Sequence, residues 1–335
     1  MVQVSPHPTC MGRIDPRDVK GGSTVSDLNG YYDSQNIIYA FDRTLGKPIL
    51  SCVLHHSDNH EGGVGLTLSH CRSENGGKTW SELTPVEGYP PQSHDGYQIL
   101  VGDRIYVIYG WNKGSQIPMS SVSLSRTDMQ LDDGFWLRWS DDFGRSFGLG
   151  STSSGGASCS ASVTDRRRLL IPVRRTKIDR SNPWAGKPTI GAFGCDKPSL
   201  IDGMLFLAFQ KTRDGNGESY GSEVFFMRCR NFLAWHYANL LKGSRDASGE
   251  DLKSVESEML WETLPKDSDF GLQTHRGLLL GEEPHIFQLS GPNLMCIWRT
   301  ELGFLDSAYS GDYGDTWNHA GNRDFCRVSR RSFVS

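Results

Sequence analysis

The eight-residue stretch "SGDYGDTW" (residues 310–317) is a repeat, because two variants of it occur earlier in the chain. These are "SENGGKTW" (residues 73–80) and "SDDFGRSF" (residues 140–147). Each copy is too polar to lie in a hydrophobic core and too short to form a helix or strand by itself. Its serine and its aspartate or asparagine can hydrogen-bond the amides of a turn, its fifth residue is a glycine that tolerates positive φ, and its last residue is an aromatic cover. We predict that each copy closes the last hairpin of a repeated β unit.

Short runs of β-branched and aromatic residues, separated by Gly, Asp and Asn, fill much of the chain. They group into five units of three strands; the first unit is "NIIYAF", "KPILSCVL" and "GVGLTLSHC", and the third begins with "SASV" and "RLLIPV". The stretch "NFLAWHYANLLKG" (residues 231–243) is the one expected helix. Antiparallel units that repeat at roughly 40 to 70 residues are typical of propeller blades. The sequence therefore predicts an all-β protein of the β-propeller class.

Charge excludes two classes of partner. The 335 residues carry 35 basic and 39 acidic side chains, a net charge of -4, so the chain lacks the basic surface that binds nucleic acid or an anionic membrane. The basic run "DRRRLLIPVRRTKIDR" (residues 165–180) has no interleaved aromatic residues and does not change this expectation. Eight widely spaced cysteines without a Cys-x-x-Cys motif predict free core thiols and no metal site. We expect no cofactor and a monomer.

The first residues show no signal peptide, and no apolar run is long enough to span a membrane. As written, the sequence therefore predicts a cytoplasmic protein. A leader lost from an incomplete N-terminus would instead make it a secreted protein, and the compartment stays open.

The repeated pattern Ser-x-Asp-x-Gly-x-Thr-Trp resembles the Asp-box, or BNR repeat, of the sialidase (neuraminidase) superfamily. This resemblance implies a propeller of six or seven blades that acts on or binds glycans. It divides the chain into an N-terminal segment (residues 1–33), the propeller (34–320) and a tail (321–335). Five visible units make the ring short by one or two blades. An open ring exposes strand edges and an apolar flank, so we expect low stability or incomplete activity.

The stretch around the third turn carries the strongest functional resemblance. In sialidases a glutamate opens the first strand of such a blade, an arginine closes the second, and an Asp-box follows. Glu283 and Arg299 fit that pattern. The resemblance implies that Glu283 is the general base and that Arg299 grips a substrate carboxylate. The alternative is an ordinary ion pair at the end of a strand.

Other positions depart from the family pattern. Asn36 stands where the first family arginine would lie, and the loop "HHSDNHEGGVG" (residues 55–65) stands where the catalytic aspartate would lie. That loop offers Asp58 and His60 instead. The third arginine and the nucleophilic tyrosine of the family have no counterpart before the chain ends. These departures put sialidase-type hydrolysis in doubt.

Further polar residues lie at the predicted strand ends, where a propeller places its central funnel. They are His94, Arg175, Lys197 and Lys211. Together with the residues above they predict a site for an acidic oligosaccharide or polysaccharide. Two chemistries stay open: hydrolysis of the exo-sialidase type, and β-elimination in which His60 or His94 removes a proton while Lys197 or Arg299 neutralises the carboxylate. The alternative is a catalytically inactive, lectin-like propeller.

Overall fold

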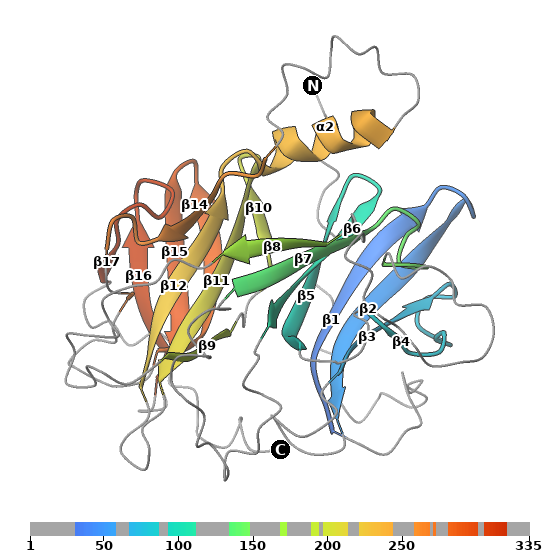
Figure 1. Ribbon diagram of the computed structural model, residues 1–335, viewed down its shortest axis with the longest axis horizontal. Coiled ribbons are helices and arrows are strands. Elements are labelled where there is room, and N and C mark those ends of the chain that lie inside the picture. Colours follow the sequence, from blue (N-terminus) through green and yellow to red (C-terminus); the bar gives the residue numbers. More distant parts are fainter. Residues whose placement is uncertain are drawn as a thin grey trace.

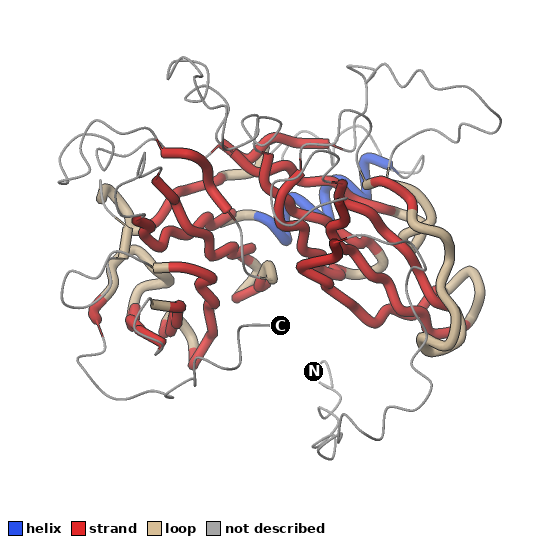
Figure 2. The backbone as a smooth tube through the Cα atoms, turned by 90° about the horizontal axis from the view of Figure 1, so that it is seen from below, coloured by secondary structure: helices blue, strands red, loops and turns tan. Residues whose placement is uncertain are grey.

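The computed structural model describes residues 31–57, 67–86, 93–111, 134–147, 168–172, 189–193, 197–213, 221–243, 258–268, 271–272, 281–300 and 305–319. Over these residues the chain folds into four antiparallel sheets with little helix (Figure 1). Figure 2 shows that strands make up most of the described backbone, and among the described residues α2 (Phe232–Gly243) is the one helix. The predicted all-β class is confirmed.

Each sheet is built mainly from strands that are consecutive in the chain. Sheet 1 contains β1 (Tyr31–Asp42), β2 (Lys47–Ser57), β3 (Thr67–Ser73) and β4 (Thr84–Pro85). Sheet 2 contains β5 (Ser93–Val101), β6 (Arg104–Trp111), β7 (Gly134–Ser140) and β8 (Arg168–Pro172). Sheet 3 contains β10 (Ser199–Ile201), β11 (Met204–Arg213), β12 (Gly221–Cys229) and β13 (Trp261–Leu264), and β9 (Thr189–Phe193) also pairs with β11. Sheet 4 contains β14 (Glu282–Ser290), β15 (Asn293–Arg299), β16 (Leu305–Ser310) and β17 (Asn318–His319).

The predicted division into five units of three strands differs from this arrangement. Strand β8, which was expected in a third unit, pairs with β7 as the outer strand of sheet 2. The run "SASV" lies outside the described residues. Every sheet gains a fourth strand, most of them short, after the third one. Such short edge strands carry little sequence signal, because two paired residues have no periodicity to read.

The helix α2 (Phe232–Gly243) confirms the expected helix to within one residue at its start. Asn231 lies just before it, and its side-chain oxygen accepts a hydrogen bond from the Leu260 amide at 2.8 Å. In the described part of the chain, no helix has the length and apolar character needed to cross a membrane.

The sheets pack face to face in chain order, from the blue sheet 1 to the red sheet 4 in Figure 1. Because side chains alternate between the two faces of a strand, each middle sheet presents an apolar layer on both sides. Sheets 1 and 2 share the cluster of Ile38, Val53, Leu68, Ile105, Val107 and Tyr109. Sheets 2 and 3 share that of Tyr106, Phe135, Leu137, Leu207, Phe209 and Phe225. Sheets 3 and 4 share that of Phe206, Ala208, Phe226, Ile286, Leu294 and Trp298.

The three repeated turns adopt the predicted geometry. In the third, Ser310 Oγ donates to Asp312 Oδ1 at 2.7 Å and accepts the Gly314 amide at 2.8 Å, while Asp312 Oδ1 accepts the Thr316 amide at 2.9 Å. The other two turns repeat these bonds with Asn75 and Asp142 in place of Asp312. The fifth residue has positive φ in each copy, at Gly77, Gly144 and Gly314. Burial opposes ionisation of Asp312, but the bonds from Thr316 and Ser310 lower the pKa of its carboxyl.

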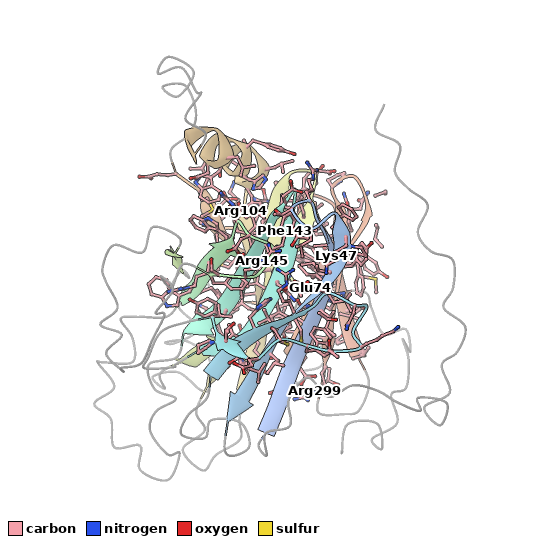
Figure 3. All side chains as sticks on the ribbon, turned by 90° about the vertical axis from the view of Figure 1, so that its right-hand side faces the viewer. Lys47, Glu74, Arg104, Phe143, Arg145 and Arg299 are labelled. Carbon is pink, nitrogen blue, oxygen red and sulfur yellow. The ribbon has the colours of Figure 1, made fainter. Side chains whose placement is uncertain are left out.

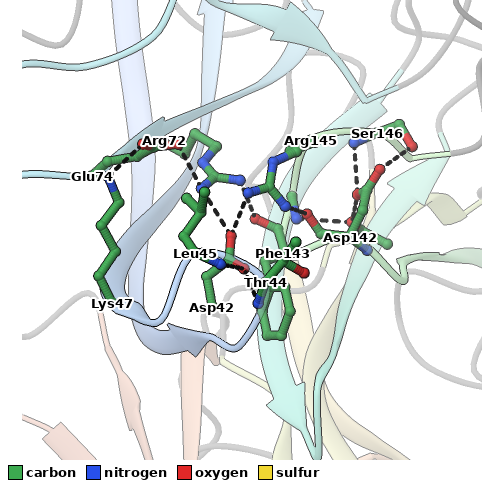
Figure 4. A network of polar contacts seen from close by, with 12 residues as sticks. Asp42, Thr44, Leu45, Lys47, Arg72, Glu74, Asp142, Phe143, Arg145 and Ser146 are labelled. Carbon is green, nitrogen blue, oxygen red and sulfur yellow. Dashed lines mark hydrogen bonds and ion pairs between the residues drawn. The ribbon is translucent and has the colours of Figure 1, made fainter.

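Two of these turns are bonded to the preceding sheet by a buried arginine. Arg72, the second-to-last residue of β3, donates through Nη1 to the Phe143 carbonyl of the second turn at 3.4 Å. Arg228 occupies the same place in sheet 3 and donates through Nη1 to the Tyr313 carbonyl of the third turn at 2.8 Å. Figure 4 shows the first of these networks, in which Arg72 and Arg145 converge on the carboxylate of Asp42. Charged side chains therefore join sheets 1 and 2, and sheets 3 and 4, beside the apolar layers.

A second polar network lies inside the junction of sheets 1 and 2. Asn36 accepts a hydrogen bond from the backbone amide of Gln98 through Oδ1 at 3.0 Å. The Gln98 side chain accepts from Ser51 Oγ at 2.7 Å, and Ser51 Oγ lies 2.8 Å from His70 Nε2. Gly144 packs so closely on the His70 ring that a Cβ atom there would lie 2.7 Å from it. Asn36 thus has a structural role in this chain.

His70 predicts how stability depends on pH. Burial, assisted by the charge of Arg72, lowers the pKa of His70 to about 3. Between that value and the ordinary histidine pKa, the unfolded chain binds a proton that the folded chain refuses, so stability falls as the pH drops. The slope from one such group reaches about 1.4 kcal/mol per pH unit. The free energy of unfolding of the wild type should therefore fall between pH 7 and pH 5 by about 2 kcal/mol more than that of His70→Gln.

Urea unfolding at the two pH values measures this difference. Equal losses in the wild type and in His70→Gln would contradict the assignment. His70→Gln removes the titrating ring and keeps a polar group near Ser51. Comparing each protein with itself at the two pH values therefore separates the pH dependence of the free energy of unfolding from the loss of packing, which is present at both.

The four described cysteines, Cys52, Cys71, Cys229 and Cys296, are buried thiols that form no disulfide. For these four the predicted core thiols are confirmed. Cys52 and Cys71 face each other across β2 and β3. Among the described residues, no three His, Cys, Asp or Glu side chains come close enough together to hold a metal ion.

Candidate functional site

Strand register brings the expected Glu283 and Arg299 to one end of sheet 4. Glu282 pairs with Arg299, and Arg299 pairs with Leu305, so the ends of β14, β15 and β16 meet there. The third turn lies at the other end of the same strands. In Figure 3, Arg299 correspondingly lies well apart from the group formed by Lys47, Glu74 and Arg145. The candidate site and the repeated turns therefore occupy opposite ends of the sheets.

Arg299 is held by two carboxylates. Its Nη1 lies 2.7 Å from Glu283 Oε1, and its Nη2 contacts Glu282 Oε2. The two glutamates differ in burial: the side chain of Glu282 is 6% exposed, whereas that of Glu283 is 46% exposed. Glu282 is thus a fixed anchor for the guanidinium, and Glu283 is the partner with room to move away from it.

The backbone of Glu283 adopts an uncommon conformation. Its φ is +49°, and it lies where the pairing of β14 with β15 shifts register between Glu282 and His285. Its amide donates to Gln210 Oε1 of sheet 3 at 2.8 Å. A non-glycine residue at positive φ costs free energy, and such residues cluster at functional sites. The bulge turns the Glu283 side chain toward Arg299, and Gln210 fixes the bulge in place.

Lys211 belongs to a neighbouring group. Side chains alternate along β11, so Lys211 lies on the opposite face of the strand from Gln210. Its Nζ lies 4.7 Å from the centre of the Phe225 ring, and it pairs across the strands with Glu223. Glu223 Oε2 accepts the Gly271 amide at 2.9 Å. Lys211 is nearly fully buried, so its cation is part of the packed junction between sheets 2 and 3 at this end.

The other predicted site residues are only partly placed. Lys197 is exposed, just before β10. His94 lies in β5, where it pairs with Gly110, but its side chain is outside the described residues. Asp58, His60 and Arg175 also lie outside them. The expected histidine and aspartate chemistry therefore stays a prediction.

Two contributors to the site were not predicted from the sequence. Glu282 directly precedes the expected glutamate, so the consecutive "EE" pair was the signal in the sequence. The predicted strand alone does not say which of the two glutamate side chains is buried. Gln210 ends the predicted strand "MLFLAFQ" of a different sheet. Its hydrogen bond with the Glu283 amide joins residues 73 positions apart in the sequence, and no local pattern reveals such a contact.

Comparison with known proteins places this geometry in context. No protein-family model matches the sequence, and no curated protein does. Among solved structures, the described fold matches a Hadza microbial sialidase with 14% identity and a TM-score of 0.47. The chain resembles sialidases. Similar matches are a Trypanosoma rangeli sialidase mutant displaying trans-sialidase activity (13% identity, TM-score 0.48) and the NanB sialidase of Streptococcus pneumoniae (10%, 0.46).

The sialidase matches cover most of this chain but only part of each sialidase. They span 86% of this chain and 46% of the Hadza enzyme, 86% and 37% for the Trypanosoma rangeli enzyme, and 92% and 55% for the Streptococcus pneumoniae enzyme. This chain thus corresponds to about half or less of each sialidase chain.

Proposed function

We propose that this chain is a sialidase-like glycoside hydrolase for glycans that carry a carboxylate, and that its four sheets are blades of a β-propeller. The observation that carries the proposal is the position of Arg299 between Glu282 and Glu283 at the end of sheet 4. A guanidinium fork binds a carboxylate with two parallel hydrogen bonds, which is the recognition that an acidic sugar needs. The packing of the four sheets in chain order supports the propeller.

Substrate binding is proposed to exchange one carboxylate for another. The buried Glu282 stays on Arg299, and the substrate carboxylate takes the place of the exposed Glu283. The displaced Glu283 loses its contact with the guanidinium but stays near two other carboxylates, and this excess of negative charge favours transfer of a proton to Glu283. Glu283 then accepts that proton from the attacking hydroxyl of a tyrosine or a water molecule. Arg175 and Lys197 remain proposed as further contacts for the acidic substrate, whereas the buried Lys211 is proposed to act only through its positive charge at this end of the sheets.

One observation favours a second function. Both carboxylates already neutralise Arg299, which is also what a purely structural ion pair would show. A glycan-binding propeller without activity fits this arrangement. Elimination by His60 or His94 stays a prediction, to be read from formation of an unsaturated uronate.

Replacing Glu283 tests the hydrolase directly. Glu283→Gln keeps the size of the side chain but cannot accept a proton, so kcat/KM for a fluorogenic sialoside should fall by about 100-fold or more. Arg299→Met should raise KM more strongly than Glu283→Gln does, because it removes the carboxylate contact.

The matched control is Glu82→Gln, because Glu82 is exposed and its backbone carbonyl accepts a hydrogen bond from Ser81 Oγ at 3.2 Å. Its activity should equal that of the wild type. If a folded wild type releases no fluorophore, the proposal that this chain hydrolyses the sialoside is wrong. Retention of a sialoside by the wild type and its loss in Arg299→Met would then favour the binding function.

A further inference from the structure

At its turn end, between its first hairpin and the end of its third strand, each sheet has a position on one face that the next element can cover; we call this position the socket. In sheet 1 the socket is formed by Ala40, Ile49 and Arg72. Phe143 of the second turn fills it, packing on Ala40 and Ile49 while its carbonyl accepts from Arg72. An aromatic residue of the next sheet therefore closes this junction.

Sheet 3 repeats the arrangement with the third turn. Its socket is formed by Asp202, Met204 and Arg228. Tyr313 fills it: its hydroxyl donates to Asp202 Oδ2 at 2.8 Å, its carbonyl accepts from Arg228 at 2.8 Å, and its ring packs on the shared apolar cluster with Met204. The same strand positions in two different sheets thus receive the same kind of residue.

Sheet 2 receives a helix instead. Val101, Arg104 and Trp139 form its socket, and no repeated turn follows β12. Helix α2 supplies Phe232 and Trp235 to the cluster that contains Val101 and Trp139, and the rings of Trp139 and Trp235 meet edge to face at 5.9 Å. Aromatic filling is therefore common to all three junctions, whatever element provides it.

The socket of sheet 4 is open. Ser310 of β16 pairs with Leu294, and Ser73 of β3 pairs with Leu50. Asn293 precedes Leu294 as Ile49 precedes Leu50, so Asn293 and Ile49 occupy the same strand position. Here a hollow of about 370 Å³ is lined by Leu289, Ser290, Asn293, Tyr309, Ser310, Gly311 and Asn318. Leu289 is 54% exposed and Phe287 beside it is 38% exposed. This face lies at the strand positions of the three filled sockets, and its apolar side chains are exposed.

The complementary surface lies at the other end of the row, on the outer face of sheet 1. Ile37, Tyr39 and Phe41 alternate along β1 and are 48%, 65% and 51% exposed. Tyr39 pairs with Leu50, which pairs with Ser73. The corresponding residue of sheet 2 is Leu100, which pairs with Ile105, itself paired with Ser140. Leu100 packs against the socket of sheet 1. Tyr39 occupies the equivalent strand position of sheet 1, so it can pack against a socket of another sheet in the same way.

The first turn differs from the other two at the residue that fills a socket. It has Gly76 where the later turns have Phe143 and Tyr313, and the space around Gly76 is open to at least 4 Å. A neighbour packed on this face would therefore meet Tyr39 as the protruding aromatic residue, with room beside it.

We propose that a second copy of this chain packs the outer face of its sheet 1 on sheet 4, with its Tyr39 in the open socket. The contact continues the sheet-on-sheet packing of the three internal junctions and removes exposed apolar residues from water on both sides. It is head to tail, because the two faces belong to different sheets. This proposal is an alternative to the monomer expected from the sequence.

Sedimentation of the full chain over a range of concentrations tests this contact. The average mass of the wild type should rise with concentration. Tyr39→Asp and Leu289→Asp each place a charge in the contact and should weaken association by at least about tenfold. Tyr237→Asp, an equally exposed tyrosine on α2, should leave it unchanged. All three positions are exposed, so circular dichroism should show the wild-type fold in each variant.

Mixing the two variants distinguishes head-to-tail packing from a symmetric contact. Tyr39→Asp keeps an intact sheet 4 and Leu289→Asp keeps an intact outer face of sheet 1, so the mixture should associate where neither variant alone does. A wild type that stays monomeric up to about 100 µM overturns the proposal. So does association that both substitutions leave unchanged, or a mixture that fails to associate.

Discussion

Replacing Arg228 by methionine is expected to lower the free energy of unfolding by about 3 kcal/mol. The guanidinium is 3% exposed and donates to Glu262 at 2.6 Å, to Asp315 at 2.6 Å and to the Tyr313 carbonyl. Methionine preserves the apolar stem but leaves two carboxylates and a carbonyl without this donor. Because Asp315 and Tyr313 belong to the third turn, the substitution also weakens the junction of sheets 3 and 4.

Arg230 provides a matched control on the same carboxylate. It contacts Glu262 at 2.5 Å, but its side chain is 44% exposed. Solvent screens such a pair, so Arg230→Met should cost about 1 kcal/mol or less. Urea unfolding of both variants measures the difference. Equal costs would mean that the link to the third turn contributes nothing, and would contradict the role given to Arg228.

Replacing Asp42 by alanine is expected to cost a similar amount, about 3 kcal/mol or more. Its carboxylate has no exposed surface and accepts four donors: the amides of Thr44 and Leu45, Arg72 at 3.2 Å and Arg145 at 2.5 Å. The variant therefore loses a turn cap and leaves a buried guanidinium without its buried partner. Burial opposes ionisation of Asp42, but the Leu45 amide and the two arginines lower the pKa of its carboxyl.

The lowered pKa of Asp42 gives this prediction a pH dependence. Its contribution is complete above the ordinary aspartate pKa and is lost as the pH falls through the lower folded value. The difference between the wild type and Asp42→Ala should therefore shrink in acid. Asp103 is the control, because its ion pair with Arg43 joins the same two sheets at 3.2 Å with both side chains well exposed. Asp103→Ala should change stability by about 0.5 kcal/mol at most, and a larger loss than in Asp42→Ala would contradict the assignment.

Local sequence patterns predicted the parts of the fold that depend on local contacts. The turns were predictable because each closes with its own side chains and one glycine within eight residues. The strands from β1 to β3 and from β14 to β16 were predictable because their apolar runs are long. The short outer strands were not, and β8 was assigned to the wrong unit. An edge strand pairs with whichever strand lies next to it in the folded chain, and that strand can come from any part of the sequence.

The repeated turns, the all-β class, the likeness to sialidases and the choice of Glu283 and Arg299 as a pair could all be predicted from the residues alone. Three features could not be predicted without the folded chain: Glu282 is the buried anchor of Arg299, Gln210 fixes the backbone of Glu283, and an arginine of one sheet holds the turn of the next. These contacts join residues from 17 to 87 positions apart in the chain. They exist only because stacked sheets bring distant strand ends within hydrogen-bonding distance, and no local pattern of residues records that approach.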